Sequence, residues 1–282
     1  MTPEPAAVEP VVPEPVVPEP AAESAPARGK TNPATSFGRA HGAYELGRPE
    51  YPAAALAWLL PASPGHVVDV GAGTGKLSRG VLAAGHRVTA VDPDPEMLAA
   101  LARRSPEVST RVGTGEATGL ASACADGIVF GQSWHWVDPA AGSREAARVL
   151  RPGGRLGLIW NTRDDRSDLV RELTRIMGES HAEQLLRSGG PRIEAPFAPP
   201  ETARWEWTRQ MTVLEIIAMA ESRSLLITMP EPERARTLGE IRTLLAEHPD
   251  SAGRERIPMP YVTRGFRAEA PRAARPGGAA RR

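Results

Sequence analysis

The sequence predicts an α/β fold with a mostly parallel sheet, and three observations lead to this prediction. Short apolar runs alternate with segments of helical period over residues 36–267. The first apolar run, His66–Val70, breaks directly into a glycine-rich turn that opens a helix. The next, Arg87–Val91, ends at Asp92 and is again followed by a helix. A strand, a tight turn and a helix in repeated succession are typical of parallel βαβ units.

The expected elements follow from the same patterns in chain order. Helices are expected where apolar residues recur at helical spacing, at 53–60, 76–84, 95–104, a segment ending at Leu150, 169–177, 182–186, a segment opening at Thr212, and 232–246. Strands are expected at the apolar or alternating runs 66–70, 87–92, 108–112, 127–130, 155–160, 203–208 and 257–267. The glycine-containing stretch Arg151–Gly154 is expected to reverse the chain before the fifth strand.

Two helix starts are marked by capping residues. Asp94 precedes Pro95 and Glu96, which places an acceptor at the N-cap, proline at the first position and an acid in the first turn. Thr212 and Glu215 have the spacing of a capping box. Both patterns predict well-defined helix N-termini.

The two ends of the chain differ in composition from the middle. Residues 1–35 are rich in Pro, Glu and Ala, with residues 11–15 repeated as residues 16–20. Proline removes amide donors and fixes φ, so we expect a disordered spacer; a docking peptide and a mis-assigned start codon are alternatives. Residues 268–282 are expected to be a second disordered tail, which leaves residues 36–267 as one domain.

Composition excludes several classes of protein. The formal net charge is +0, which argues against nucleic-acid binding through bulk charge. The single cysteine, Cys124, excludes an internal disulfide, and the six histidines show no metal-ligand spacing. The longest apolar stretch, Ala53–Leu60, is far shorter than the ~20 residues that span a bilayer. We therefore expect a cytoplasmic protein with no metal and no membrane contact.

The glycine-rich turn Gly71–Gly75 carries the most information about function. A phosphate-binding P-loop needs glycine where Val70 stands and Ser or Thr where Leu77 stands, so that interpretation fails twice. The fingerprint of dinucleotide-binding proteins needs a third glycine or an alanine where Lys76 stands, so this interpretation fails as well.

The spacing that is present, Asp-x-Gly-x-Gly-x-Gly over residues 69–75, resembles motif I of the class I methyltransferases that use S-adenosylmethionine. Asp92, at the end of the second strand, matches the acid that accepts hydrogen bonds from the ribose in that family. The resemblance implies a Rossmann-like sheet of about seven strands with an antiparallel last strand and helices on both faces. It implies cofactor contacts from Asp69, Gly71, Ala72, Gly73, Asp92, Pro93, Met97, Thr114, Gly115, Glu116 and Gln132.

A closer resemblance extends over about residues 37–267. The segments that carry it are similar to the small-molecule subfamily that includes trans-aconitate methyltransferase-like proteins. They are Tyr44, Arg48-Pro49, Tyr51-Pro52, Gln132–Asp138, Asn161–Asp164, Ser222–Ser224 and Pro260–Arg264. These segments indicate a subfamily and name no substrate.

Methyl transfer from a sulfonium is an in-line displacement that needs alignment, exclusion of water and sometimes a base. His135 follows the fourth strand and is the candidate for orienting or deprotonating an acceptor, with a structural histidine as the alternative. Tyr44 and Arg48 are the other catalytic candidates, as parts of an N-terminal lid with Tyr51. Arg48 or Arg223 could hold a second carboxylate of the acceptor.

The sequence therefore predicts an S-adenosylmethionine-dependent methyltransferase that acts on oxygen, a carboxylate included, or carbon of a small molecule, as a monomer or homodimer. Two alternatives remain. One is a methyltransferase of macromolecules, and the other is a non-catalytic cofactor-binding protein whose Pro/Glu-rich tail docks a partner. The polar segment Gln132–Asp138 separates an enzyme from a non-catalytic binder, because a protein that only binds the cofactor needs no polar group above its methyl group.

Overall fold

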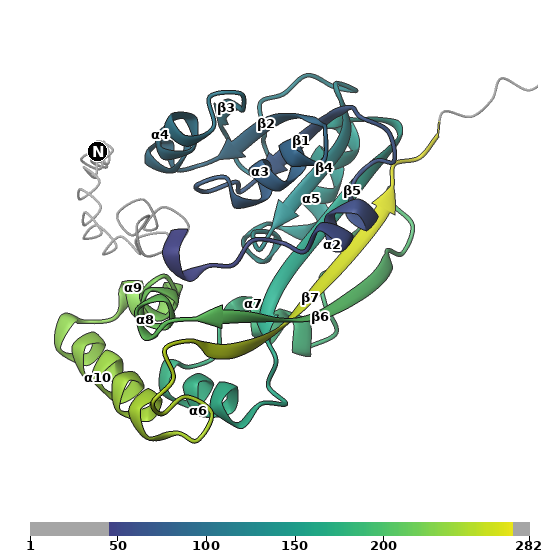
Figure 1. Ribbon diagram of the computed structural model, residues 1–282. Helices are drawn as coiled ribbons and strands as arrows, with labels where there is room; N and C mark the ends of the chain where they lie inside the picture. The colour runs from purple at the N-terminus through teal and green to yellow at the C-terminus, as the bar shows by residue number, and fades with distance from the viewer. Residues whose placement is uncertain (1–44, 273–282) are drawn as a thin grey trace, which may run out of the picture. The chain divides into compact units, whose positions relative to one another are not determined.

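The computed structural model describes residues 45–272, and within them seven strands form one sheet (Figure 1). The strands are His66–Val70 (β1), Arg87–Asp92 (β2), Ser109–Val112 (β3), Ala125–Gly131 (β4), Leu150–Arg163 (β5), Glu201–Met211 (β6) and Ile257–Glu269 (β7). Their order is β3-β2-β1-β4-β5-β7-β6. Strands β1 to β5 are parallel, and β7 runs antiparallel to both neighbours, β5 and β6. The predicted mostly parallel sheet with an antiparallel last strand is confirmed.

One described helix precedes β1, and the others lie between successive strands of the chain. In chain order, the helices are Ala53–Leu59 (α2), Lys76–Ala83 (α3), Pro95–Arg104 (α4), Pro139–Val149 (α5), Asp168–Met177 (α6), His181–Arg187 (α7), Val213–Glu221 (α8), Ser224–Thr228 (α9) and Glu231–Glu247 (α10), with a 3-10 turn at Trp134–Trp136 (η2). None of these helices in residues 45–272 is long and apolar enough to cross a membrane.

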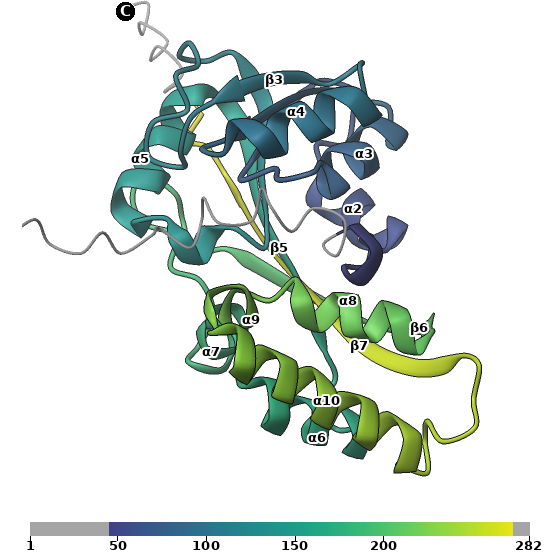
Figure 2. The same cartoon turned by 90° about the vertical axis from the view of Figure 1, so that its left-hand side faces the viewer.

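The sheet is buried on both faces because its central strands are apolar at most positions. Val68 and Val70 of β1 pack into a core with α5, whereas Val67 points to the other face and packs with α2, α3 and α4. Figure 2 shows α5 on the opposite side of β5 from α2 and α3. This two-sided burial is what parallel strands require, since the crossover helices cover both faces. It confirms the predicted helices on both faces.

A third core lies beyond the ends of β6 and β7. Helices α6, α8, α9 and α10, here termed the helical lobe, bury apolar residues there against Met211, Ile257 and Met259. Figure 1 shows these helices gathered beside the two strands. The lobe therefore has a core distinct from the two that cover the sheet.

The predicted helix starts form as expected. The Asp94 carboxylate accepts hydrogen bonds from the backbone N–H groups of Glu96 and Met97. The Thr212–Glu215 capping box is closed in both directions. Each cap satisfies N–H groups that have no partner within the helix.

Two expected boundaries are wrong, and both errors lie where β5 meets β7. Strand β5 begins at Leu150, which pairs with Ala125 and is buried, so the stretch 151–154 forms an irregular part of the strand in place of a reversal. Gly153, at φ +78°, donates its N–H to the carbonyl of Ala270. Pairing with β5 also carries β7 on to Glu269, so a tail boundary at residue 268 falls inside the strand.

Candidate functional site

A cavity of about 350 Å³ lies at the carboxyl ends of β1, β2, β4 and β5. Residues that follow these strands line one side, here termed the cofactor side. Residues of β5, α7, α8 and the start of α9, together with Arg48, line the other, here termed the acceptor side. Ligands bind at this edge of open parallel sheets because the strand order reverses there.

The turn after β1 is held against β2. The N–H groups of Gly71 and Ala72 both donate to the carbonyl of Val91, at 2.8 and 3.2 Å. Gly71 and Gly73 have φ of +69° and +55°, a conformation that favours glycine. A Cβ on Gly71 would collide with Ser133, whereas a Cβ on Gly73 would meet no protein atom within 4 Å. Gly73 lines the cavity, so its missing side chain leaves room for a ligand against the backbone.

Asp92, at the end of β2, also lines the cavity and is 6% exposed. Its two oxygens accept from the N–H groups of Gly73, at 2.8 Å, and Asp94, at 2.9 Å. A carboxylate oxygen can accept more than one hydrogen bond, so both keep capacity for ligand hydroxyls. Burial raises the pKa of Asp92 to about 6.

Asp69 is fully buried in β1 and lies outside the cavity lining, as does Ala72. One oxygen of Asp69 accepts from the Ser78 hydroxyl at 2.6 Å, and the other, Oδ1, has no hydrogen-bond partner. Burial raises the pKa of Asp69 to about 7, with the charge of Asp92 adding to the rise. An unpaired buried acid beside the glycine turn marks a place where a polar or cationic ligand group is favoured.

The remaining predicted cofactor residues all line the cavity: Pro93, Met97, Thr114, Gly115, Glu116 and Gln132. Gln132 has a backbone φ of +55°, which is uncommon for residues other than glycine. Its N–H donates to the carbonyl of Ile159, which holds the end of β4 to β5 in this conformation. Backbone strain of this kind clusters at functional sites.

His135 lies in the 3-10 turn η2 and lines the cavity. Burial lowers the pKa of His135 to about 3, with the charges of His181 and Arg48 adding to the effect. The ring is therefore neutral at physiological pH. The indole N–H of Trp160 donates to Nδ1 of His135 in a long contact of 3.5 Å. This contact favours the tautomer with its proton on Nε2, which makes the other ring nitrogen a hydrogen-bond donor.

The segment before α2 connects the glycine turn to the helical lobe. Glu45 forms ion pairs with Lys76, Arg79 and Arg104. Arg48 lines the cavity and donates from Nε and Nη2 to the hydroxyl and carbonyl of Ser222, at 3.0 and 3.1 Å. Tyr44, the other expected lid residue, lies outside the described residues.

The acceptor side holds a buried ion cluster that sequence reasoning did not find. Glu183 pairs with Arg163 at 3.1 Å and with Arg223 at 2.9 Å, and all three side chains line the cavity. The two arginines hold the pKa of Glu183 well below its usual range despite its burial. Burial and the charge of Arg223 lower the pKa of Arg163 to about 10.

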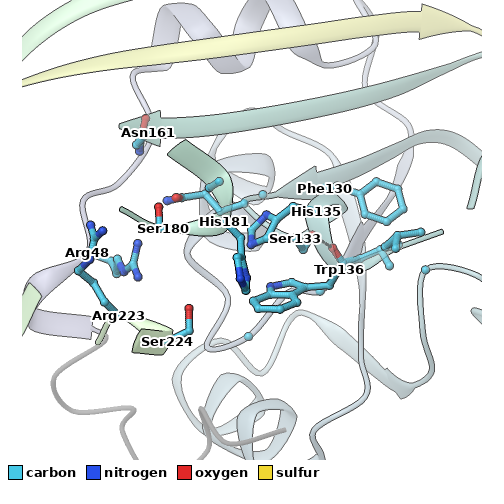
Figure 3. Close-up of a pocket in the computed structure, with 18 of the residues that line it drawn as sticks. Arg48, Phe130, Ser133, His135, Trp136, Asn161, Ser180, His181, Arg223 and Ser224 are labelled. Atoms are coloured by element: carbon cyan, nitrogen blue, oxygen red, sulfur yellow. Dashed lines mark hydrogen bonds between the residues drawn. The ribbon is translucent and has the colours of Figure 1, made fainter. Parts of the chain in front are cut away.

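Two further lining residues were not predicted as site residues, His181 and Tyr261. The His181 ring meets Trp136 edge to face, with centroids 5.1 Å apart, in the centre of the view in Figure 3. The spacing of Ser180 and Glu183 signals a capping box and hence α7, which the structure forms. Nothing in the sequence signals that Glu183 also pairs with arginines from β5 and the start of α9.

Comparisons with known proteins agree with this geometry. The profile of the methyltransferase domain family (Methyltransf_11) matches residues 68–158. An uncharacterized methyltransferase of Mycobacterium tuberculosis (strain ATCC 25618 / H37Rv) is 46% identical over 233 residues, which cover 81% of this chain and 93% of that protein. An uncharacterized methyltransferase-like protein of Schizosaccharomyces pombe is 29% identical over 241 residues, covering 80% and 92%. A solved structure described as a type II methyltransferase from Anaeromyxobacter dehalogenans has the same fold, with a TM-score of 0.59, 24% identity, and coverage of 80% of this chain and 99% of that one.

Proposed function

Because the chain belongs to the class I S-adenosylmethionine-dependent methyltransferases, we propose that it methylates a small-molecule acceptor on an oxygen, a carboxylate included, or on a carbon. The single observation that carries the acceptor proposal is the cavity, in which the glycine turn and the acceptor side line one space of about 350 Å³. A volume in this range is typical of small-ligand sites. The closer resemblance to trans-aconitate methyltransferase-like proteins stays a prediction.

The cofactor side fits S-adenosylmethionine by its chemistry. The space above Gly73 admits a ligand against the backbone, and Asp92 keeps acceptor capacity for two ribose hydroxyls. Asp69 lies outside the cavity lining, so its orphan Oδ1 favours the cationic methionine tail through water. When bound, the cofactor supplies a methyl group on a sulfonium, which an acceptor atom displaces in line.

We assign the chain's own residues three tasks in the transfer. Phe130 and Trp136 wall the cavity and exclude water from the reacting atoms. The neutral ring of His135 carries its proton on Nε2 and orients the acceptor by donating a hydrogen bond from that nitrogen. Arg48, fixed by its two bonds to Ser222, closes the cavity from the side of the N-terminal segment.

Calorimetry followed by a methyl-transfer screen tests this function. We expect S-adenosylhomocysteine to bind with a Kd well below about 1 mM, which corresponds to only ~4 kcal/mol. A radiolabelled methyl group should then pass from S-adenosylmethionine to members of a metabolite panel. Cofactor binding with transfer to a protein or RNA fraction and to no metabolite would replace the small-molecule proposal. Cofactor binding with no transfer to any of these would favour a non-catalytic binder.

A further inference from the structure

The acceptor side of the cavity has an excess of positive charge. Arg48, Arg163 and Arg223 line it, and Glu183 is the acid among its lining residues in the described chain. His135 adds no charge, because burial lowers its pKa to about 3. The other lining acids, Asp92 and Glu116, belong to the cofactor side. Charge that is buried at this density is costly unless a partner offsets it.

Arg223 has a hydrogen-bond donor that no protein atom uses. Its side chain is 6% exposed. Nη2 donates to Glu183 at 2.9 Å and to the carbonyl of Gly178 at 2.8 Å, which fixes the guanidinium plane. Nε is buried and has no hydrogen-bond partner. Unsatisfied buried donors are rare in native proteins, and one on a cavity-lining arginine indicates a ligand acceptor atom.

The surroundings of Arg223 suit a negatively charged oxygen. Figure 3 shows Arg223 and Arg48 on the same side of the cavity, with Ser224 beside them. Ser224 lines the cavity and brings a hydroxyl group to this side, whereas the hydroxyl of Ser180 already donates to Glu183 at 2.9 Å. Guanidinium and hydroxyl groups are the donors that proteins use for carboxylate and phosphate. A cationic acceptor would meet repulsion from three arginines.

We propose that the methyl acceptor is an anion, and that Arg223 binds its carboxylate or phosphate oxygen through Nε while the methylated atom lies toward His135. Glu183 and Arg163 are positioning residues: Glu183 holds the Arg223 guanidinium, and Arg163 holds Glu183 through a 3.1 Å ion pair. This inference rests on the proposed methyltransferase function. It adds the chemical class of the acceptor, which the family alone does not give.

Calorimetry on the full chain saturated with S-adenosylhomocysteine tests the inference without any variant. The probes are succinate, inorganic phosphate and uncharged succinamide. We expect one or both anions to bind at least about tenfold more tightly than succinamide, which is ~1.4 kcal/mol, and more weakly as salt increases. Preference for succinate or for phosphate identifies the anionic group. If S-adenosylhomocysteine binds but neither anion binds more tightly than succinamide, the anion site is wrong and the proposed function stands. If S-adenosylhomocysteine does not bind, the proposed function itself fails.

Variants then locate the site. Arg223→Gln should weaken anion binding at least about tenfold, as expected for loss of a charge-assisted hydrogen bond, and leave S-adenosylhomocysteine affinity unchanged. In Arg223→Gln the Glu183 carboxylate keeps its ion pair with Arg163, so no buried charge is stranded, and denaturant unfolding of this variant checks that it folds. Arg171→Gln, on the exposed face of α6 where Arg171 pairs with Asp168, is the matched control and should bind both ligands normally. Anion affinity that is unchanged in the folded Arg223→Gln variant would overturn the assignment.

Discussion

The N–H of Gly73 donates to Oδ2 of Asp92 at 2.8 Å, so the glycine turn after β1 and the acid that ends β2 form one unit. The bond fixes the carboxylate without help from a ligand. The cofactor side is therefore preorganised, and binding there does not have to order the acid.

Asp92→Asn tests this unit. The amide keeps the shape but loses the charge and one acceptor atom, so affinity for S-adenosylhomocysteine should fall about tenfold to hundredfold, or ~1.5–3 kcal/mol. Isothermal titration measures the change. Asp126→Asn is the control, because Asp126 pairs with Arg151 outside the cavity lining. Equal affinity of Asp92→Asn and wild type would show that the ribose site lies elsewhere.

Gly73→Ala should separate cofactor binding from stability. Gly73 has φ +55° and Gly85 has φ +89°, and at both positions a Cβ would meet nothing within 4 Å. Each alanine variant should therefore lose about 1 kcal/mol of unfolding free energy from backbone strain. Gly73 lines the cavity and Gly85 does not, so we expect loss of S-adenosylhomocysteine affinity in Gly73→Ala alone. Denaturant unfolding and calorimetry on both variants give the comparison, and parallel behaviour would contradict it.

Asp69→Asn should change how stability depends on pH. Since the pKa of Asp69 is raised to about 7, the folded protein binds more protons than the unfolded chain between about pH 4 and pH 7. Raising the pH through this window therefore destabilises the wild type, and Asp92 acts in the same direction because its pKa is raised to about 6.

The variant has no carboxylate to ionise at position 69. Its free energy of unfolding, relative to wild type, should improve by an amount on the order of 1–4 kcal/mol between about pH 5 and about pH 8. Urea unfolding at the two pH values measures the difference. A constant difference would mean that Asp69 titrates normally in the folded protein.

His135→Ala should lower kcat about a hundredfold once an acceptor is known, with KM changed little, because the lost hydrogen bond orients the reacting group. In wild type the rate should show no ionisation near the usual histidine value, since the pKa of His135 is lowered to about 3. His248→Ala, in the turn after α10, is the control and should turn over normally. Unchanged kcat would leave His135 a packing residue between its aromatic neighbours.

The cofactor side could be predicted because its signals are local in the sequence. Asp69, the glycines and Asp92 lie at strand ends whose apolar runs mark them, and parallel strands bring those ends to one edge. Thr114 and Glu116 follow β3 by the same rule. All but Asp69 and Ala72 of the predicted cofactor residues line the cavity.

The acceptor side could not be predicted in the same way. Arg163, Glu183 and Arg223 come from three separate elements, and their pairing depends on how α7 and the helical lobe pack against the end of β5. No spacing rule connects residues so far apart in the chain. The sequence suggests Arg223 as a ligand for a carboxylate. Its unpartnered Nε and its hydrogen bond to Glu183 depend on the folded structure and have no signal in the sequence.

The position of β7 between β5 and β6 also sets an order of events during protein synthesis. Apart from Arg48, the residues of the acceptor side leave the ribosome after those of the cofactor side, and β7, made last, joins β6 to the sheet. Because chains begin to fold from the N-terminal end as they emerge, a nascent chain that stops before Ile257 can pair β1 to β5 but cannot bring β6 into the sheet. Each new molecule should therefore be able to hold its methyl donor before it can recognise anything to methylate.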